Sequence, residues 1–376
     1  MKTRKKRSFL SSVLFFFNHL AVLALLTVYA GSYISPAVFW PVAFAGLAYP
    51  LILIINVAFV VLWIMRLRPW FLLSLIAILI GWNHVGAFIQ INKKGADLPG
   101  SGKAISVLSY NVRVFDLYNY GPNWELNFEN RNNIFRFLEQ KDFDIICFQE
   151  FVHDKSGAFK TLDTLPSFLR AKHAHAGYIK SSRKINFFGL ATFSAYPIVN
   201  RGEIKFPTQM GNMAIYSDIA IQEDTIRVYN VHFESIGLSP EDYLFMETIT
   251  EPGGMGDRNY VRERTVNILN RLRRAFIKRA EQVEIISGHI RQSPYPVILA
   301  GDFNDTPASW AYRQLTRELE DAFRSGRGIG QTYIGQIPGF RIDYILHSSH
   351  FTSHEFTTGD QIYSDHYPLW VWLWWE

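Results

Sequence analysis

Side chains that can bind a metal ion or transfer a proton stand at the ends of several predicted strands in this chain. The clearest example is the segment Pro296 to Pro307, in which a buried strand, Val297 to Ala300, passes through a glycine to Asp302 and Asn304. A helical pattern from Ala308 to Glu320 follows at once. Such a unit holds polar groups on a rigid platform, as catalytic sites on α/β sheets commonly do. A single Asp-x-Asn would equally suit a turn that caps the next helix, so the interpretation depends on the rest of the chain.

The same arrangement recurs at five other strand ends. Asn111 follows 105–110, Glu150 follows 143–149, His232 follows 225–231, Asp343 lies in 341–346, and Asp365 with His366 lies in 363–371. If these ends meet, carboxylates, amides and two imidazoles share one cleft. Hard oxygen ligands with few sulfurs suit Mg²⁺ or Mn²⁺, and an imidazole beside a carboxylate suits proton transfer. The set could therefore polarise a phosphate group, orient a water molecule and neutralise developing charge.

The elements that must position these residues are typical of an α/β domain. Helices are expected at 130–140 and 262–290, and further strands at 188–193 and 214–221. Short strands interleaved with helices and hairpins predict two packed sheets flanked by helices. The ~270 residues from 104 to 376 suit one domain of this kind. Cys147 is the only cysteine, which excludes an intrachain disulfide.

The first ninety residues have a different character. The chain is 48% hydrophobic and 15% aromatic, with 38 Lys+Arg against 33 Asp+Glu, and the apolar excess is concentrated here. Apolar runs at about 9–30, 37–65 and 70–89 each exceed the roughly 18 to 20 residues that a helix needs to cross a bilayer. A cleavable signal peptide would explain only the first run. We therefore predict a membrane anchor at 1–91 with three transmembrane helices, a linker at 92–103 and a catalytic domain at 104–376.

Flanking charges predict the orientation of this anchor. Basic residues at 4–7 precede the first span, and Arg66 and Arg68 lie between the second and third. Positive residues favour the cytoplasmic side, so an odd number of spans places the catalytic domain on the outer, periplasmic or extracytoplasmic side of the cytoplasmic membrane. Lys93 and Lys94 argue weakly for the opposite orientation.

Several short motifs of the second part resemble those of a known family. They are Ser-Tyr-Asn at 109–111, Phe-Gln-Glu at 148–150, Gly-Asp-Phe-Asn at 301–304, Arg-Ile-Asp at 341–343 and Ser-Asp-His at 364–366. In this order they resemble the endonuclease/exonuclease/phosphatase superfamily, the DNase I-like proteins that include AP endonucleases, neutral sphingomyelinases and inositol-polyphosphate 5-phosphatases. The resemblance covers about residues 104–376. It implies a four-layer α/β sandwich, here preceded by the three transmembrane helices.

The resemblance also implies a divalent-metal site. Glu150 would be the main ligand of Mg²⁺ or Mn²⁺, helped by Asn111 and, through water or a second ion, by Asp365.

The remaining site residues would then have catalytic roles. His366 would contact the scissile phosphate, with its ring held by Asp343. Asp302 would orient or deprotonate the attacking water, and Asn304 and His232 would donate hydrogen bonds to the phosphoryl oxygens in the transition state.

The class of substrate stays open. Asn304 is followed by Asp305 and Thr306, which departs from the pattern of the 5-phosphatases. We expect a membrane-anchored phosphodiesterase that acts on phospholipid or sphingolipid headgroups. The alternative is a membrane-tethered nuclease that hydrolyses DNA or RNA, and a catalytically silent binding domain is least favoured because every polar position of the site is filled. A basic run within 258–279 would suit lipid or nucleic-acid phosphates, although a solvated helix face also accounts for it.

Overall fold

The computed structural model describes residues 9–92, 101–120, 125–155, 157, 159–182, 185–207, 211–250, 257–335 and 339–376. Several regions considered in the sequence lie outside these residues: the basic residues 4–7, Lys93 and Lys94, and most of the expected linker.

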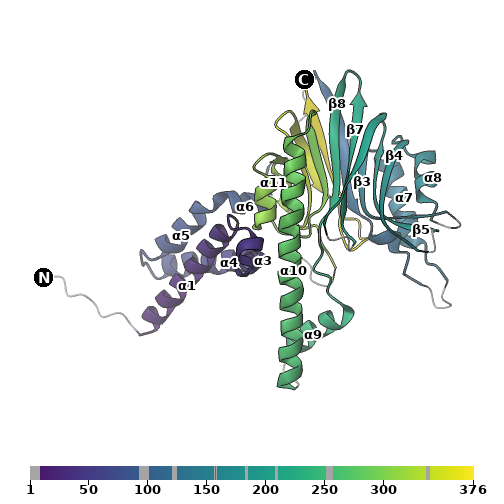
Figure 1. The fold of residues 1–376 in the computed structure, drawn as a ribbon. Coiled ribbons are helices and arrows are strands. Elements are labelled where there is room, and N and C mark those ends of the chain that lie inside the picture. Colours follow the sequence, from purple (N-terminus) through teal and green to yellow (C-terminus); the bar gives the residue numbers. More distant parts are fainter. Residues whose placement is uncertain are drawn as a thin grey trace.

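Two six-stranded sheets form the centre of the second part of the chain (Figure 1). The first has the strand order β13-β14-β2-β3-β5-β4, and the second has the order β10-β12-β9-β8-β7-β6. Both are mixed, because β2 pairs with β3 and β8 with β9 in parallel while their other pairs are antiparallel. The first sheet comprises β2 (Lys103–Asn111), β3 (Ile145–Asp154), β4 (His173–Ser182), β5 (Asn186–Ser194), β13 (Thr352–Thr358) and β14 (Leu369–Trp375). The second comprises β6 (Ile198–Ile204), β7 (Met213–Ile221), β8 (Asp224–His232), β9 (Val297–Asp302), β10 (Glu320–Asp321) and β12 (Asp343–His347).

The two sheets pack face to face through aliphatic side chains. Val107 and Ile145 of the first sheet share a buried cluster with Val228, Ile298 and Ile345 of the second. Alternate residues of a strand point to opposite faces, so the other face of each sheet needs its own cover.

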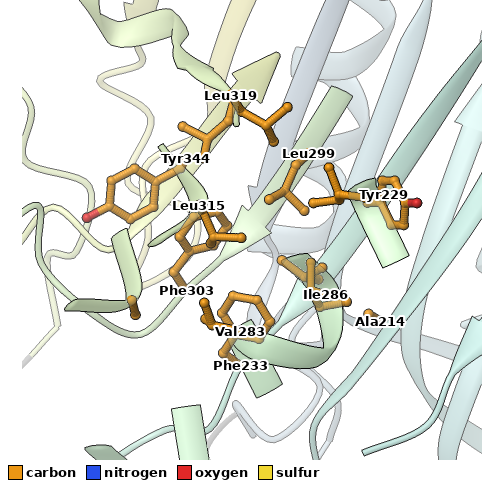
Figure 2. Packing of buried hydrophobic residues seen from close by; sticks show 14 of the residues in the cluster. Ala214, Tyr229, Phe233, Val283, Ile286, Leu299, Phe303, Leu315, Leu319 and Tyr344 are labelled. Atoms are coloured by element: carbon orange, nitrogen blue, oxygen red, sulfur yellow. The ribbon is translucent and has the colours of Figure 1, made fainter. Parts of the chain in front are cut away.

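Helices provide this cover on both outer faces. The helical elements of this part are η2 (Arg113–Asp116), α7 (Glu129–Lys141), α8 (Thr161–Phe168), α9 (Pro240–Thr250), α10 (Arg258–Arg291), α11 (Trp310–Leu315) and η3 (Ala322–Ser325). Helix α7 packs on the first sheet through Ile134 and Leu138. Figure 2 shows Val283 and Ile286 of α10 against Leu299 of the second sheet. The predicted arrangement of two mixed sheets flanked by helices is therefore confirmed.

Two predicted boundaries were wrong. The helix expected to reach Glu320 ends at Leu315, because Thr316 turns its hydroxyl back to the carbonyl of Tyr312 and the chain must then enter β10. The strand expected at 363–371 begins only at Leu369, after the segment that carries Asp365 and His366.

The first part of the chain is a bundle of helices. It comprises α1 (Phe9–Gly31), α2 (Pro36–Phe39), η1 (Trp40–Val42), α3 (Ala43–Leu47), α4 (Tyr49–Met65), α5 (Phe71–Ile80) and α6 (Trp82–Phe88). Helix α1 is long and apolar enough to cross a membrane. The other two expected spans are bent, by 53° between Pro36–Leu47 and Tyr49–Met65 and by 70° between Phe71–Ile80 and Trp82–Phe88. One span is thus clear on length and composition, and three result only if each bent pair counts as one.

Close packing and buried polar contacts hold the bundle together. A Cβ atom at Gly81, where the last pair bends, would lie 1.9 Å from Cζ of Tyr29, so any larger residue there would have to displace the Tyr29 ring. The Asn18 amide donates to the Ser74 hydroxyl at 2.6 Å and accepts from the Trp63 indole at 2.8 Å. These contacts join α1, α4 and α5.

The bundle is docked on the α/β domain. Strand β1 (Ile89–Ile91) pairs with β11 (Arg327–Ile329), and the buried Arg341 guanidinium donates to the Ala87 carbonyl at 2.8 Å. The ring of Phe44 in α3 lies 5.3 Å from the ring of Phe276 in α10. Paired backbone and buried contacts therefore place the two parts relative to each other.

Candidate active site

The polar residues predicted at strand ends meet at one edge of the sandwich. Asn111 ends β2 in the first sheet, and Asp302 ends β9 in the second. His232, at the end of β8, and Asp343, at the start of the antiparallel β12, are both in register with Asp302. The Asn111 amide donates to Oδ2 of Asp302 at 3.1 Å, which links the two sheets at this edge.

Asp302 is the centre of the group and is buried. Its Oδ1 accepts from the backbone N–H of Asn304 at 2.8 Å. Its Oδ2 lies 3.6 Å from Nε2 of His232 and 3.8 Å from Nε2 of His366. A Cβ atom at the preceding Gly301 would lie 2.0 Å from a carbonyl oxygen of β8, so glycine is required for this close strand pairing.

His366 is held by Asp343. Nδ1 of the ring lies 2.8 Å from Oδ2 of Asp343, and both side chains are buried. The Thr332 hydroxyl accepts from the backbone N–H of Asp343 at 3.1 Å, and the Tyr333 ring meets the His366 ring edge to face at 5.1 Å. This support leaves Nε2 as the ring nitrogen on the Asp302 side.

Burial and neighbouring charges shift the pKa values of two residues in this cluster. Burial raises the pKa of Asp302 to about 6, and the neighbouring Asp343 charge contributes to the rise. Burial alone would lower the pKa of His366, but the facing carboxylates of Asp343 and Asp302 outweigh it and raise the pKa to about 10. At neutral pH the site therefore holds an ionised Asp302 beside a cationic His366.

Glu150 presents a carboxylate at the mouth of the site. Its strand has an irregular register between Phe148 and Phe151, and Glu150 itself has a φ of 50°, a strained value for a residue other than glycine. The side chain is 38% exposed, and its Oε1 lies 3.3 Å from the Asn111 amide nitrogen and 4.0 Å from Nε2 of His232. The Glu150 carboxylate offers the hard oxygen donors that Mg²⁺ and Mn²⁺ prefer. The Asn111 amide turns its nitrogen toward Glu150, and its oxygen accepts from the backbone N–H of Arg113 at 3.0 Å. Rotation of this amide would place a second oxygen donor beside Glu150, and with that rotation the residues present fit such an ion.

A second group could also hold a cation. Ligand atoms of Asp302, Asp343 and His366 all lie within 4.8 Å of one another. Oδ1 of Asp343 is buried without a hydrogen-bond partner among the described residues. The raised pKa of His366 opposes metal binding there, because the ring must lose its proton to act as a ligand.

Two predicted residues lie at the margin of the site. Asn304 has a φ of 53° and donates its side-chain amide to the Phe233 carbonyl at 3.0 Å. Oδ2 of Asp365 lies 3.7 Å from Nε of Arg113, and its Oδ1 accepts from the Ser364 hydroxyl at 3.3 Å. The structure thus groups Asn111, Glu150, His232, Asp302, Asp343 and His366 directly, with Asn304 and Asp365 beside them.

Sequence reasoning missed Arg113. It begins a turn in which all four residues, 113 to 116, have positive φ, a conformation that costs non-glycine residues energy. The Arg113 side chain is exposed next to Asp365. The only signal in the sequence was an arginine two residues after Asn111. The left-handed turn that brings its side chain next to Asp365 cannot be predicted from residue types.

Comparisons with known proteins follow the same division of the chain. Residues 108–366 match the model of the Endonuclease/Exonuclease/phosphatase family, and residues 11–88 match a family described only as a domain of unknown function. No curated protein matches the chain. An endonuclease/exonuclease/phosphatase from Beutenbergia cavernae DSM 12333 is 14% identical, with a TM-score of 0.51 and coverage of 72% of each chain. A family protein from Bacteroides thetaiotaomicron is 15% identical, with a TM-score of 0.51 and coverage of 73% of this chain and 99% of that chain. At these identities the two structures support the fold alone.

Proposed function

Because this chain belongs to the endonuclease/exonuclease/phosphatase family, whose members hydrolyse phosphoesters, we propose that it is a membrane-anchored, divalent-metal-dependent phosphodiesterase. One observation carries the proposal: the buried Asp302 lies 3.8 Å from Nε2 of His366, with Asn111, Glu150 and His232 around them. This group combines a base, a fixed positive charge and a candidate metal site within one cluster.

Glu150 and Asn111 would hold the metal ion, with Asp365 acting through water or a second ion. The ion would supply a Lewis acid that polarises the phosphoryl oxygen and neutralises the charge that develops on it. The exposure of Glu150 leaves this position open to a substrate phosphate.

The protein's own residues would carry out the remaining steps. Asp302 accepts a proton from the attacking water, whose oxygen forms the new bond to phosphorus as the ester P–O bond breaks. His366 contacts the phosphate with Nε2, since Asp343 holds the other ring nitrogen. His232 donates a hydrogen bond to a phosphoryl oxygen. The second amide proton of Asn304 does the same, while the first stays on the Phe233 carbonyl.

A lipid headgroup is the favoured substrate. We infer that the bundle crosses the bilayer three times, each bent pair counting as one span, with the catalytic domain on the outer side. Contacts such as those of β1 with β11 and of Phe44 with Phe276 hold the catalytic domain against the bundle. A catalytic domain fixed near the bilayer meets lipid at a high effective concentration. The alternative substrate is nucleic acid, favoured by the basic residues of α10.

The test is a parallel hydrolysis assay on the purified full-length protein with Mg²⁺ or Mn²⁺. One reaction contains plasmid DNA and single-stranded RNA, and the other contains mixed phospholipid and sphingolipid vesicles. The Asp302→Ala variant controls for contaminating enzymes. We expect metal-dependent headgroup release with intact nucleic acid. Cleaved DNA or RNA with intact lipid would establish the nuclease instead, and no hydrolysis of either would refute the phosphodiesterase.

A further inference from the structure

Residues Arg258–Arg274 of α10 form an arm that carries none of the proposed catalytic residues. The arm is about 25 Å long at 1.5 Å per residue and is largely exposed. In Figure 1 it extends beyond the sandwich, next to α9 and on the side where the bundle lies.

One side of the arm is already occupied. The buried Asp242 of α9 lies 3.8 Å from Nη1 of Arg264 and 3.5 Å from Nε of Arg271. Arg271 also donates to the Gly237 carbonyl. On this side of the arm, Arg264 and Arg271 therefore already have contacts within the protein.

The opposite side of the arm faces the bundle. Phe276, just beyond the arm, packs on Phe44, and the Arg273 guanidinium lies 5.4 Å from the centre of the Trp40 ring. Both partners belong to the segment that follows the first membrane helix. Trp40 and Phe44 lie near the start of the second expected span, so the bundle meets α10 near the edge of the expected bilayer.

Apolar and basic residues continue along this face of α10 beyond its contacts with the bundle. Leu269, Val266 and Arg262 precede Arg273 at steps of three or four residues, which keeps them on one helix face. Val266 is 46% and Leu269 42% exposed. Val38 in α2, beside the contact, is also exposed. Apolar side chains flanked by arginines suit the interface between lipid headgroups and acyl chains.

We propose that this stripe, which consists of Arg258, Arg262, Val266, Leu269 and Arg273, lies on the surface of the bilayer that holds the bundle, with its arginines on anionic headgroups. The inference rests on the proposed membrane insertion. Continuity with the contacts of Trp40 and Phe44 places the stripe at the level of the membrane surface, and its charge complements acidic lipids.

This docking would orient the active site. The buried half of α10 holds the loops that follow two catalytic strands: Arg279 contacts Asp305 at 3.2 Å and the Glu234 carbonyl at 2.9 Å. Asp305 follows Asp302 by three residues, and Glu234 follows His232 by two. One rigid helix therefore connects the lipid surface to the active-site loops.

The experiment places an environment-sensitive fluorophore at single positions of the full-length protein in vesicles of phosphatidylcholine and phosphatidylglycerol. The native Cys147 is buried, so an introduced cysteine takes the label. Leu269→Cys reports on the stripe, Leu244→Cys on an exposed apolar residue of α9 across the arm, and Ile54→Cys on the lipid-facing side of α4. Quenchers attached to the lipid acyl chains measure contact with the bilayer.

We expect the label at 269 to emit at shorter wavelength and lose most of its intensity to the quencher lipids, as the label at 54 does, while the label at 244 does not. A quenched label at 54 with an unquenched label at 269 would overturn the docking inference and leave the membrane anchor intact. Equal quenching at 269 and 244 would overturn the assignment of this face. An unquenched label at 54 would overturn the membrane insertion itself, and the docking with it.

Discussion

Replacing Asp302 by asparagine should abolish turnover and at the same time stabilise the fold at neutral pH. The carboxylate is buried and its pKa is raised from 3.8 to about 6, chiefly by burial and then by the charge of Asp343. The folded state therefore opposes ionisation of this group more than the unfolded state does. Asparagine removes the charge while keeping the shape of the side chain.

The size of the effect follows from the two pKa values. Each pH unit between them is worth about 1.4 kcal/mol, so the rise from 3.8 to about 6 costs the wild type about 3 kcal/mol above pH 6. Asparagine can satisfy only one of the two donors, Asn111 and Asn304, that now share the carboxylate, and this loss costs about 1 kcal/mol. A net gain of about 2 kcal/mol should raise Tm by about 4 °C. Below pH 3.8 both states bind the proton, so the gain should vanish there and only the lost hydrogen bond should remain.

Thermal unfolding of the detergent-solubilised full-length protein, with chelator present, measures this difference at pH 4 and pH 8. Asp343→Asn is the matched control, because it removes the carboxylate that pairs with the His366 ring at 2.8 Å. It should lower Tm at pH 8, opposite in sign to Asp302→Asn. If Asp302→Asn also lowered Tm at pH 8, or changed it equally at both pH values, the argument from a buried, ionised Asp302 would be wrong.

Three further predictions concern neighbouring residues. Glu150→Gln should raise the metal concentration needed for half-maximal hydrolysis by about a hundredfold, since even outer-shell changes cost about 10- to 100-fold; an unchanged metal titration would favour the group of Asp302, Asp343 and His366 as the metal site. Arg113 is exposed beside Asp365, and we propose that it donates a charge-assisted hydrogen bond to the substrate phosphate; Arg113→Ala should then lower kcat/KM about tenfold, mainly through KM, and unchanged steady-state kinetics would exclude this contact. The raised pKa of His366 stabilises the fold fully below pH 6.5, and this contribution is lost as the pH rises to about 10. Tm should therefore fall between pH 7 and pH 10 more steeply in the wild type than in His366→Gln.

Residue types alone were enough to predict two packed sheets flanked by helices and to place polar side chains at the ends of their strands. Strand periodicity and glycine placed Asp302 and Asn304 just after a buried strand, and the structure ends β9 at Asp302. The continuous apolar runs predicted the helices of the first part of the chain, of which Phe9–Gly31 is long and apolar enough to cross a membrane. These inferences succeeded because a strand end and an apolar run are local properties, set by neighbours in the sequence.

Tertiary structure decided which groups interact and with what charge. The sequence does not indicate that Asn111 bridges to Asp302, that the amide of Asn304 turns to a backbone carbonyl, or that Arg113 reaches Asp365 from a left-handed turn. It likewise left the basic helix without a partner, whereas the structure brings one of its faces against the bundle. The physical reason is that pKa values, pairing and exposure depend on distances between residues far apart in the chain, which only the packed fold determines.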